Sequence, residues 1–149
     1  MTKPPQYVLD ILRVLSSAGY DAVLVGGCVR DTILGRRPND WDAASSAPPE
    51  SVMRLFPRAI GTGFKHGTVT IPRGKHGVEV TTFRTEGPYS DHRRPDGVRF
   101  TDDLSADLSR RDFTINAMAM SADGSIYDPF GGHSDLRARL VRCVGDPDV

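Results

Sequence analysis

The stretch LVGGCVRDTILGRRPNDWDAA, residues Leu24 to Ala44, decides the fold expected for this chain. A short apolar strand leads into a Gly-Gly turn, a helix follows, and a second strand carries Asp40 and Asp42. Gly26 and Gly27 have no Cβ, so the backbone N–H groups at the helix N-terminus stay open to a phosphate, and the helix dipole favours an anion there. The stretch therefore predicts a phosphate-binding turn beside a strand with paired carboxylates.

The spacing of Asp40 and Asp42 predicts a metal site. Residues i and i+2 of a β-strand point to one face, so the two carboxylates lie together and Trp41 lies opposite. Hard oxygen ligands suit Mg²⁺, which usually takes one or two carboxylates plus substrate phosphates and water. Arg30, one turn into the helix, can add a charge-assisted contact to the phosphates. Each signal alone is typical of ordinary turns and loops, whereas their combination within residues 26–42 indicates a functional site.

Length and composition indicate a single globular domain. The 149 residues are 38% hydrophobic, and Lys plus Arg and Asp plus Glu both total 19, so the net charge is zero. A nucleic-acid partner would need a local basic face. Cys28 and Cys143 form no CxxC motif, which indicates neither zinc nor a disulfide framework. No apolar run approaches the roughly 18 residues of a membrane span, and we expect a soluble, cytoplasmic protein.

Hydrophobic spacing predicts an α/β (α+β) fold with a mixed sheet flanked by helices. Apolar residues at Val8, Ile11, Leu12 and Leu15 mark one face of a helix. Expected helices cover residues 4–18, 29–34, 50–56, 102–110 and 136–140, and expected strands cover residues 22–25, 68–71, 78–83, 117–120 and 125–127.

The strand VEVTTF carries a further acidic candidate. Glu79 and Thr81 share one face of this strand, so Glu79 can reach the aspartates if the two strands are neighbours. The alternative is an edge-strand glutamate that faces water.

A second charged cluster lies in RRDFTINAMAM, residues 110–120. It contains Arg110, Arg111, Asp112 and Asn116. From the residues alone, one alternative is a surface ion pair between Asp112 and the arginine next to it.

These motifs together resemble a known family. GGCVRDTILGRRPNDWD is similar to the signature motif of the class II tRNA nucleotidyltransferase (CCA-adding enzyme) and bacterial poly(A) polymerase family, within the polymerase β superfamily. Four more stretches agree in the family's order: HGTVTI, VEVTTFRTEG, RRDFTINAMAM and YDPFGG. The resemblance extends from about Tyr20 to Asp146 and implies a polymerase β-like nucleotidyltransferase head.

The resemblance also implies roles for single residues. Asp40 and Asp42 would hold Mg²⁺, and Glu79 would be a third catalytic carboxylate that helps to draw the proton from an attacking 3′-hydroxyl. The nucleotide-binding residues implied are Gly26, Gly27 and Arg30 for the triphosphate, Arg111 and Asp112 for the ribose and phosphates, and Asn116 in support.

The implied reaction is CMP and AMP addition from CTP and ATP to the 3′ end of tRNA, with release of pyrophosphate. Two alternatives stay open: a poly(A) polymerase or A-adding variant, and a nucleotide-binding module without turnover. Family members continue past VGDP into a neck that reads the base, then a body and a tail. This chain stops at Val149, so we expect residues 1–149 to be the head alone. The SDHRRPD segment, residues 90–96, resembles the family's flexible loop, and Trp41 replaces a usually aliphatic residue.

Overall fold

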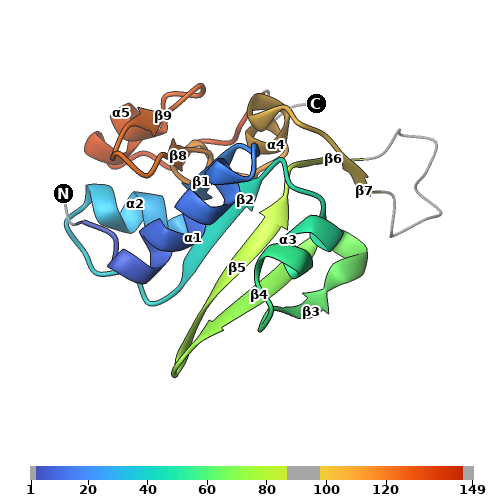
Figure 1. The fold of residues 1–149 in the computed structure, drawn as a ribbon. Helices are drawn as coiled ribbons and strands as arrows, with labels where there is room; N and C mark the ends of the chain where they lie inside the picture. Colours follow the sequence, from blue (N-terminus) through green and yellow to red (C-terminus); the bar gives the residue numbers. More distant parts are fainter. Residues whose placement is uncertain (1–2, 87–97, 146–149) are drawn as a thin grey trace.

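A seven-stranded mixed sheet forms the centre of the molecule in the computed structural model, which describes residues 3–86 and 98–145 (Figure 1). The strand order is β3-β4-β5-β2-β1-β8-β9. Strands β2 and β5 are parallel, and the other neighbouring pairs are antiparallel. The bounds are β1 Ala22–Val25, β2 Trp41–Ser45, β3 Ile60–Gly63, β4 Thr68–Arg73, β5 His76–Thr82, β8 Ala119–Met120 and β9 Ile126–Tyr127. The predicted mixed sheet is confirmed.

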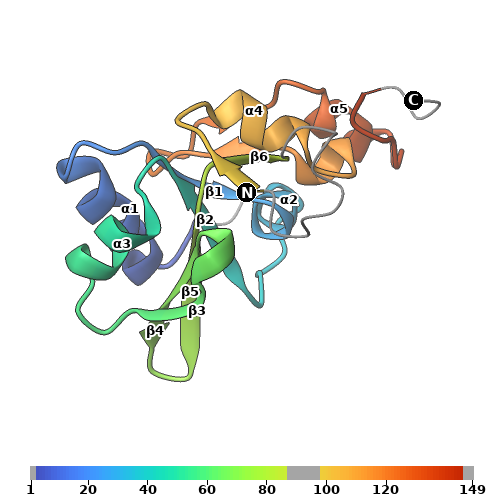
Figure 2. The ribbon, with the colours of Figure 1, turned by 90° about the vertical axis from the view of Figure 1, so that its right-hand side faces the viewer.

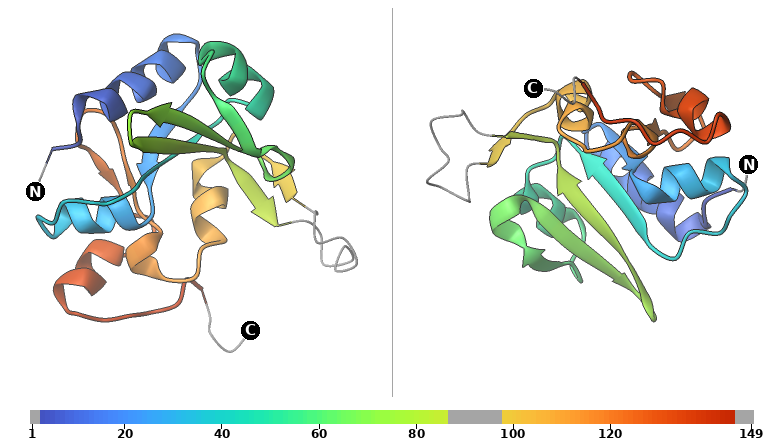
Figure 3. Two further views of the ribbon diagram at one scale, coloured as in Figure 1. Left: turned by 90° about the horizontal axis from the view of Figure 1, so that it is seen from below. Right: turned by 180° about the vertical axis from the view of Figure 1, so that it is seen from behind.

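Helices cover both faces of this sheet. Helices α1 and α3 lie side by side on one face (Figure 2), and α4 lies on the other (left panel of Figure 3). The α-helices are α1 Gln6–Ser17, α2 Gly27–Ile33, α3 Pro49–Leu55, α4 Leu104–Ser109 and α5 Gly132–Arg137, and the 3-10 helices are η1 Phe64–His66 and η3 Thr114–Asn116. The predicted arrangement of helices around a sheet is therefore confirmed.

Side-chain periodicity builds the larger core between the sheet and helices α1 and α3. The apolar stripe of α1 is buried as its spacing predicts, including Leu12 and Leu15 at 0% exposure. Alternation along β2 and β5 sends Trp41, Ala43 and Val80 to the same side of the sheet. Asp42 and Ala44 point to the opposite side of β2, so burial of Trp41 and Ala43 fixes the face on which Asp42 lies.

A smaller core lies under α4 on the other face of the sheet. Val23 and Val25 of β1 pack there with Ala44, Phe83 and Leu108. This cluster holds α4, and the residues that follow it, against the strands that carry the candidate site.

Several elements differ by a few residues from the sequence-based expectation, and two helix starts and one missed strand have a clear physical reason. Helix α2 begins at Gly27 rather than at residue 29, because the turn residue Gly26 already caps the helix. Helix α5 covers Gly132–Arg137 rather than residues 136–140, because the Asp128 carboxylate accepts hydrogen bonds from the backbone N–H groups of Gly132 and His133, at 2.7 and 2.9 Å. Strand β3 was not predicted, since its two glycines weaken the β pattern.

A separate two-stranded sheet was also not predicted. It pairs β6, Arg84–Glu86, with β7, Val98–Phe100, and neither strand was among the expected ones. The SDHRRPD segment at residues 90–96 lies outside the described residues.

Within residues 3–86 and 98–145, no helix combines the length and the apolar character that crossing a bilayer requires.

Candidate active site

The glycine turn between β1 and α2 has the conformation that the sequence predicts. Gly26 adopts φ +78° and ψ −145°, which a residue with a Cβ rarely adopts. Its carbonyl accepts hydrogen bonds from the N–H groups of Val29 and Arg30, at 3.1 and 3.3 Å, and starts the helix. The chain therefore turns from the sheet directly into a helix N-terminus.

Two guanidinium groups lie over this turn. A methyl group placed on Gly26 would lie 3.7 Å from Nη1 of Arg111, and one placed on Gly27 would lie 3.3 Å from Nη2 of Arg30. The two glycines thus leave a small space between backbone and two cations that come from distant parts of the chain. A phosphate group has the charge and the acceptor oxygens for such a site.

Arg30 is held in place by two partners. Its Nη1 donates to Oδ1 of Asn116 at 3.0 Å, and its Nε pairs with Oδ1 of Asp31 at 3.2 Å. Asn116 lies in η3, which packs against α2. The predicted supporting position of Asn116 is therefore concrete: its amide oxygen orients the arginine, and the arginine faces the turn.

Arg111 is held by Asp107, a residue that the sequence analysis missed. The Asp107 side chain is 1% exposed and pairs with Nη2 of Arg111 at 3.2 Å and with Nε of Arg110 at 3.7 Å. It also accepts the backbone N–H of Arg84 at 2.9 Å. The sequence spacing could have indicated this contact. Asp107 lies three residues before Arg110 and four before Arg111, and residues with this spacing share one face of a helix.

The expected ion pair between an arginine and Asp112 is wrong. Both arginines turn back to the buried carboxylate of Asp107 instead. Asp112 is exposed, and its carbonyl accepts the N–H of Val144 at 3.0 Å. Its carboxylate has no hydrogen-bond or ion-pair partner among the described residues, so it remains free to meet a ligand.

The three candidate carboxylates lie on β2 and β5 or beside them. Strand β2 begins at Trp41, so Asp40 occupies the bend just before the strand and Asp42 lies within it. The parallel register pairs Asp42 with Glu79, which makes them neighbours on one face of the sheet. Asp42 is half-buried, whereas Asp40 and Glu79 are exposed. Trp41 is buried on the opposite face, as the sequence predicts.

The electrostatics of Asp42 suit a bound cation. Burial raises the pKa of its carboxyl, the negative charges of Glu79 and Asp40 raise it further, and Arg111 opposes the rise. A divalent ion would relieve this repulsion, and carboxylate oxygens are the ligands that Mg²⁺ prefers. Within the described residues, no group of three or more His, Cys, Asp or Glu side chains is arranged to hold a metal ion. Asp40 and Asp42 are the residues that could hold such an ion, with its other ligands supplied by substrate and water.

The Cys28 side chain lies between the glycine turn and β2 and has a structural role. Its thiol lies 3.2 Å from the Val25 carbonyl and 3.7 Å from the Asp42 carbonyl, and donates toward both. Burial raises the pKa of the Cys28 thiol to about 11, so it stays protonated at neutral pH and is no nucleophile. The contact fastens α2 to the strand that carries Asp42.

A glycine turn under two arginines, next to acidic residues on paired strands, is the layout of a polymerase β-like nucleotidyltransferase head, and that is the class of protein that this fold and site define. The chain belongs to the poly A polymerase head domain family, whose model matches residues 22–142.

Similar proteins agree with this assignment. The chain is 53% identical over 148 residues to the CCA-adding enzyme of Geobacillus thermodenitrificans (strain NG80-2), which covers 99% of this chain and 37% of that protein. Its fold matches the Bacillus stearothermophilus CCA-adding enzyme in complex with CTP at a TM-score of 0.86 and 48% identity, over 97% of this chain and 34% of the other. The Thermotoga maritima CCA-adding enzyme complexed with tRNA matches at a TM-score of 0.70 and 25% identity, over 94% and 32%. The chain thus spans about a third of the length of these relatives.

Proposed function

We propose that this chain is the catalytic head of a template-independent RNA nucleotidyltransferase that adds CMP and AMP, from CTP and ATP, to the 3′ end of tRNA. The observation that carries the proposal is the strand register that sets Asp42 beside Glu79 while Arg111 lies over Gly26. The family and the similarity to CCA-adding enzymes support the same reaction. Because the substrates would be tRNA and free nucleotides, the proposed location is the cytoplasm.

The role proposed for each residue follows from its position in the site. The backbone N–H groups of the glycine turn, with Arg30 and Arg111, would bind the triphosphate and stabilise the charge that develops on the leaving pyrophosphate. Asp112, exposed beside Arg111, would contact the ribose. Glu79 would accept the proton of the attacking 3′-hydroxyl.

The proposed cofactor is Mg²⁺, and Asp40 and Asp42 would hold it. When bound, the ion would align the attacking oxygen and neutralise the phosphates. The supporting observation is the raised pKa of the Asp42 carboxyl, because burial and two acidic neighbours oppose its charge until a cation is present.

The test is incorporation of labelled CTP or ATP onto a tRNA that lacks its 3′ CCA, in the presence of Mg²⁺. Wild-type chain is compared with the Asp40→Ala, Asp42→Ala double variant. We expect incorporation to fall at least about 100-fold in the double variant, because metal-assisted charge stabilisation contributes several kcal/mol to the transition state. Asp123→Asn, an exposed aspartate in the β8–β9 turn, is the matched control and should keep full activity.

Each outcome has a distinct meaning. Addition that ends after C, C and A identifies CCA addition, whereas a long A-tract identifies a poly(A) polymerase instead. Metal-dependent binding of CTP without any incorporation would contradict the proposal and leave a nucleotide-binding module.

A further inference from the structure

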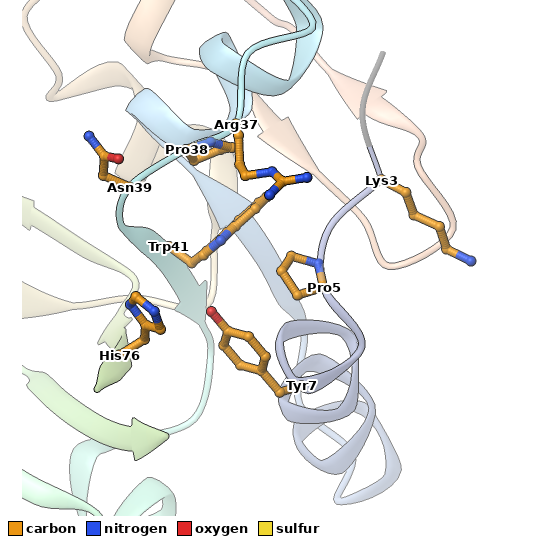
Figure 4. A pocket seen from close by; sticks show the side chains of 8 residues that line it. All are labelled: Lys3, Pro5, Tyr7, Arg37, Pro38, Asn39, Trp41 and His76. Atoms are coloured by element: carbon orange, nitrogen blue, oxygen red, sulfur yellow. The ribbon is translucent and has the colours of Figure 1, made fainter. Parts of the chain in front are cut away.

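A cavity of about 730 Å³ opens on the side of β2 opposite Asp42 (Figure 4). Its wall is made by residues before and within the first turn of α1, by the loop that leads into β2, and by the start of β5. Trp41 contributes to this wall, and consecutive strand residues point to opposite faces. The cavity is therefore separate from the glycine turn and its two arginines.

The charges that line this cavity are all basic. Lys3, Arg37 and His76 belong to the wall, and no aspartate or glutamate of residues 3–86 and 98–145 does. None of the three side chains has a hydrogen-bond or ion-pair partner among the described residues. In a chain whose Lys plus Arg and Asp plus Glu both total 19, Lys3 and Arg37 give this wall a local excess of positive charge. It would attract an anion.

The rest of the wall is made of rings and one amide. Tyr7 and Trp41 line the cavity together with two prolines, and Asn39 adds its side-chain amide. Figure 4 shows the Tyr7 and Trp41 rings near each other, with the Arg37 side chain alongside the indole. Trp41 is only 6% exposed, so core packing fixes the part of the wall that its ring edge provides. Rigid apolar ring surfaces favour a flat ligand.

We propose that this cavity is a second nucleotide site, which binds a planar base against Tyr7 and the exposed edge of Trp41 and a phosphate at Arg37. Its volume lies within the range of roughly 300 to 1,000 Å³ that small-molecule sites occupy. The shared chemistry is a base linked to a phosphate, supplied by a free nucleotide or by one nucleotide of an RNA strand. The site is independent of nucleotidyl transfer, because it uses none of the residues proposed for that reaction.

The experiment measures binding of labelled CMP by equilibrium dialysis without divalent ions, while following the fluorescence of Trp41, the only tryptophan in the chain. The Arg37→Ala, His76→Ala double variant should bind CMP at least about tenfold more weakly, because charge-assisted hydrogen bonds are lost. Both side chains are exposed, so the fold should persist. Arg73→Ala, an exposed arginine outside this cavity on the same β4–β5 hairpin, is the matched control and should bind as wild type does.

Other results would overturn the proposal. Loss of CMP binding in Arg111→Ala but not in the double variant would place the nucleotide at the glycine turn. Competition by inorganic phosphate or by cytidine as strong as by CMP would show that base and phosphate are not recognised together. The trinucleotide CpCpC distinguishes the sources: binding of CpCpC alone supports an RNA strand, binding of CMP supports a free nucleotide, and binding of neither overturns the site.

Discussion

Asp42 and Asp107 are two inward-facing carboxylates in opposite surroundings. Asp107 is 1% exposed, and its charge is fully used by Arg111, Arg110 and the backbone N–H of Arg84. Asp42 is half-buried beside Glu79, and the neighbouring charges that raise its pKa are themselves acidic. The first carboxylate completes an internal network, whereas the second leaves negative charge that the chain does not neutralise.

This difference distinguishes a carboxylate that supports the fold, Asp107, from one that belongs to the candidate site, Asp42. Asp107 places a guanidinium over the glycine turn, and everything that it needs is supplied by the fold. The cluster around Asp42 keeps neighbouring negative charges that oppose one another, and the proposed cation would neutralise them. A charged side chain without an opposite charge beside it therefore indicates the candidate site better than the presence of a charged residue alone does. Substitutions of Asp107 and Asp42 should accordingly change the free energy of unfolding in opposite directions.

The largest expected effect is at the internal network. Asp107→Asn keeps the shape of the side chain but removes the charge that two largely buried arginines share. We expect unfolding free energy to fall by about 3 kcal/mol, the cost of removing one partner of a buried ion pair. Urea unfolding measures the change. Asp103→Asn on the same helix is the control, and it should be nearly neutral because asparagine caps a helix as well as aspartate does.

A smaller effect of opposite sign is expected at the acidic cluster. Asp42→Asn removes like-charge repulsion and should stabilise the metal-free chain by about 0.5 kcal/mol. Because folding raises the pKa of Asp42, the wild-type penalty begins above the ordinary value of 3.8 and is complete once the pH exceeds the folded pKa. The gain should therefore appear at neutral pH and vanish under acid conditions. Thermal unfolding with and without Mg²⁺ tests this, since added Mg²⁺ should stabilise wild type but not the variant; equal stabilisation of both would contradict the metal site.

The smallest effect is expected at Asp135, a satisfied carboxylate like Asp107. A hydrogen bond from Thr114, at 2.6 Å, lowers the pKa of Asp135, and Arg142 at 2.9 Å lowers it further. Stability from this ionised group is present above the ordinary value of 3.8 and is lost as the pH falls through the lower folded pKa. Asp135→Asn should therefore show a shallower loss of melting temperature between about pH 5 and about pH 2 than wild type does. Identical slopes would refute the assignment.

Local pattern was enough to predict the central part of the site. The glycine turn, the helix after it and the placement of Trp41 opposite Asp42 all follow from strand alternation and helix-terminus chemistry. The neighbouring position of Glu79 was predicted only on the condition that its strand lies beside β2. Pairing between distant strands depends on the whole topology, so the structure was needed to satisfy that condition.

Tertiary contacts account for what was missed. In the sequence, Asp107 looks like an ordinary helix residue. Only when α4 packs on the sheet does the Asp107 carboxylate accept a hydrogen bond from the backbone N–H of Arg84. Gly132 belongs to the YDPFGG stretch, and the structure was needed to show that a Cβ there would overlap the carbonyl of Thr114. Neither contact can be predicted from a few neighbouring residues, because each depends on which distant segment packs beside it.

The parallel pairing of β2 with β5 also constrains the order in which the molecule can form. Asp42 and Glu79 meet only after α3, β3 and β4 have been traversed, and long-range closure of this kind slows folding more than it weakens the product. During synthesis from the N-terminus, the glycine turn and both aspartates emerge well before Glu79, and Arg111 emerges later still. The nascent chain therefore carries the glycine turn and both aspartates before Glu79 and Arg111, the partners that the fold sets beside them, have been synthesised.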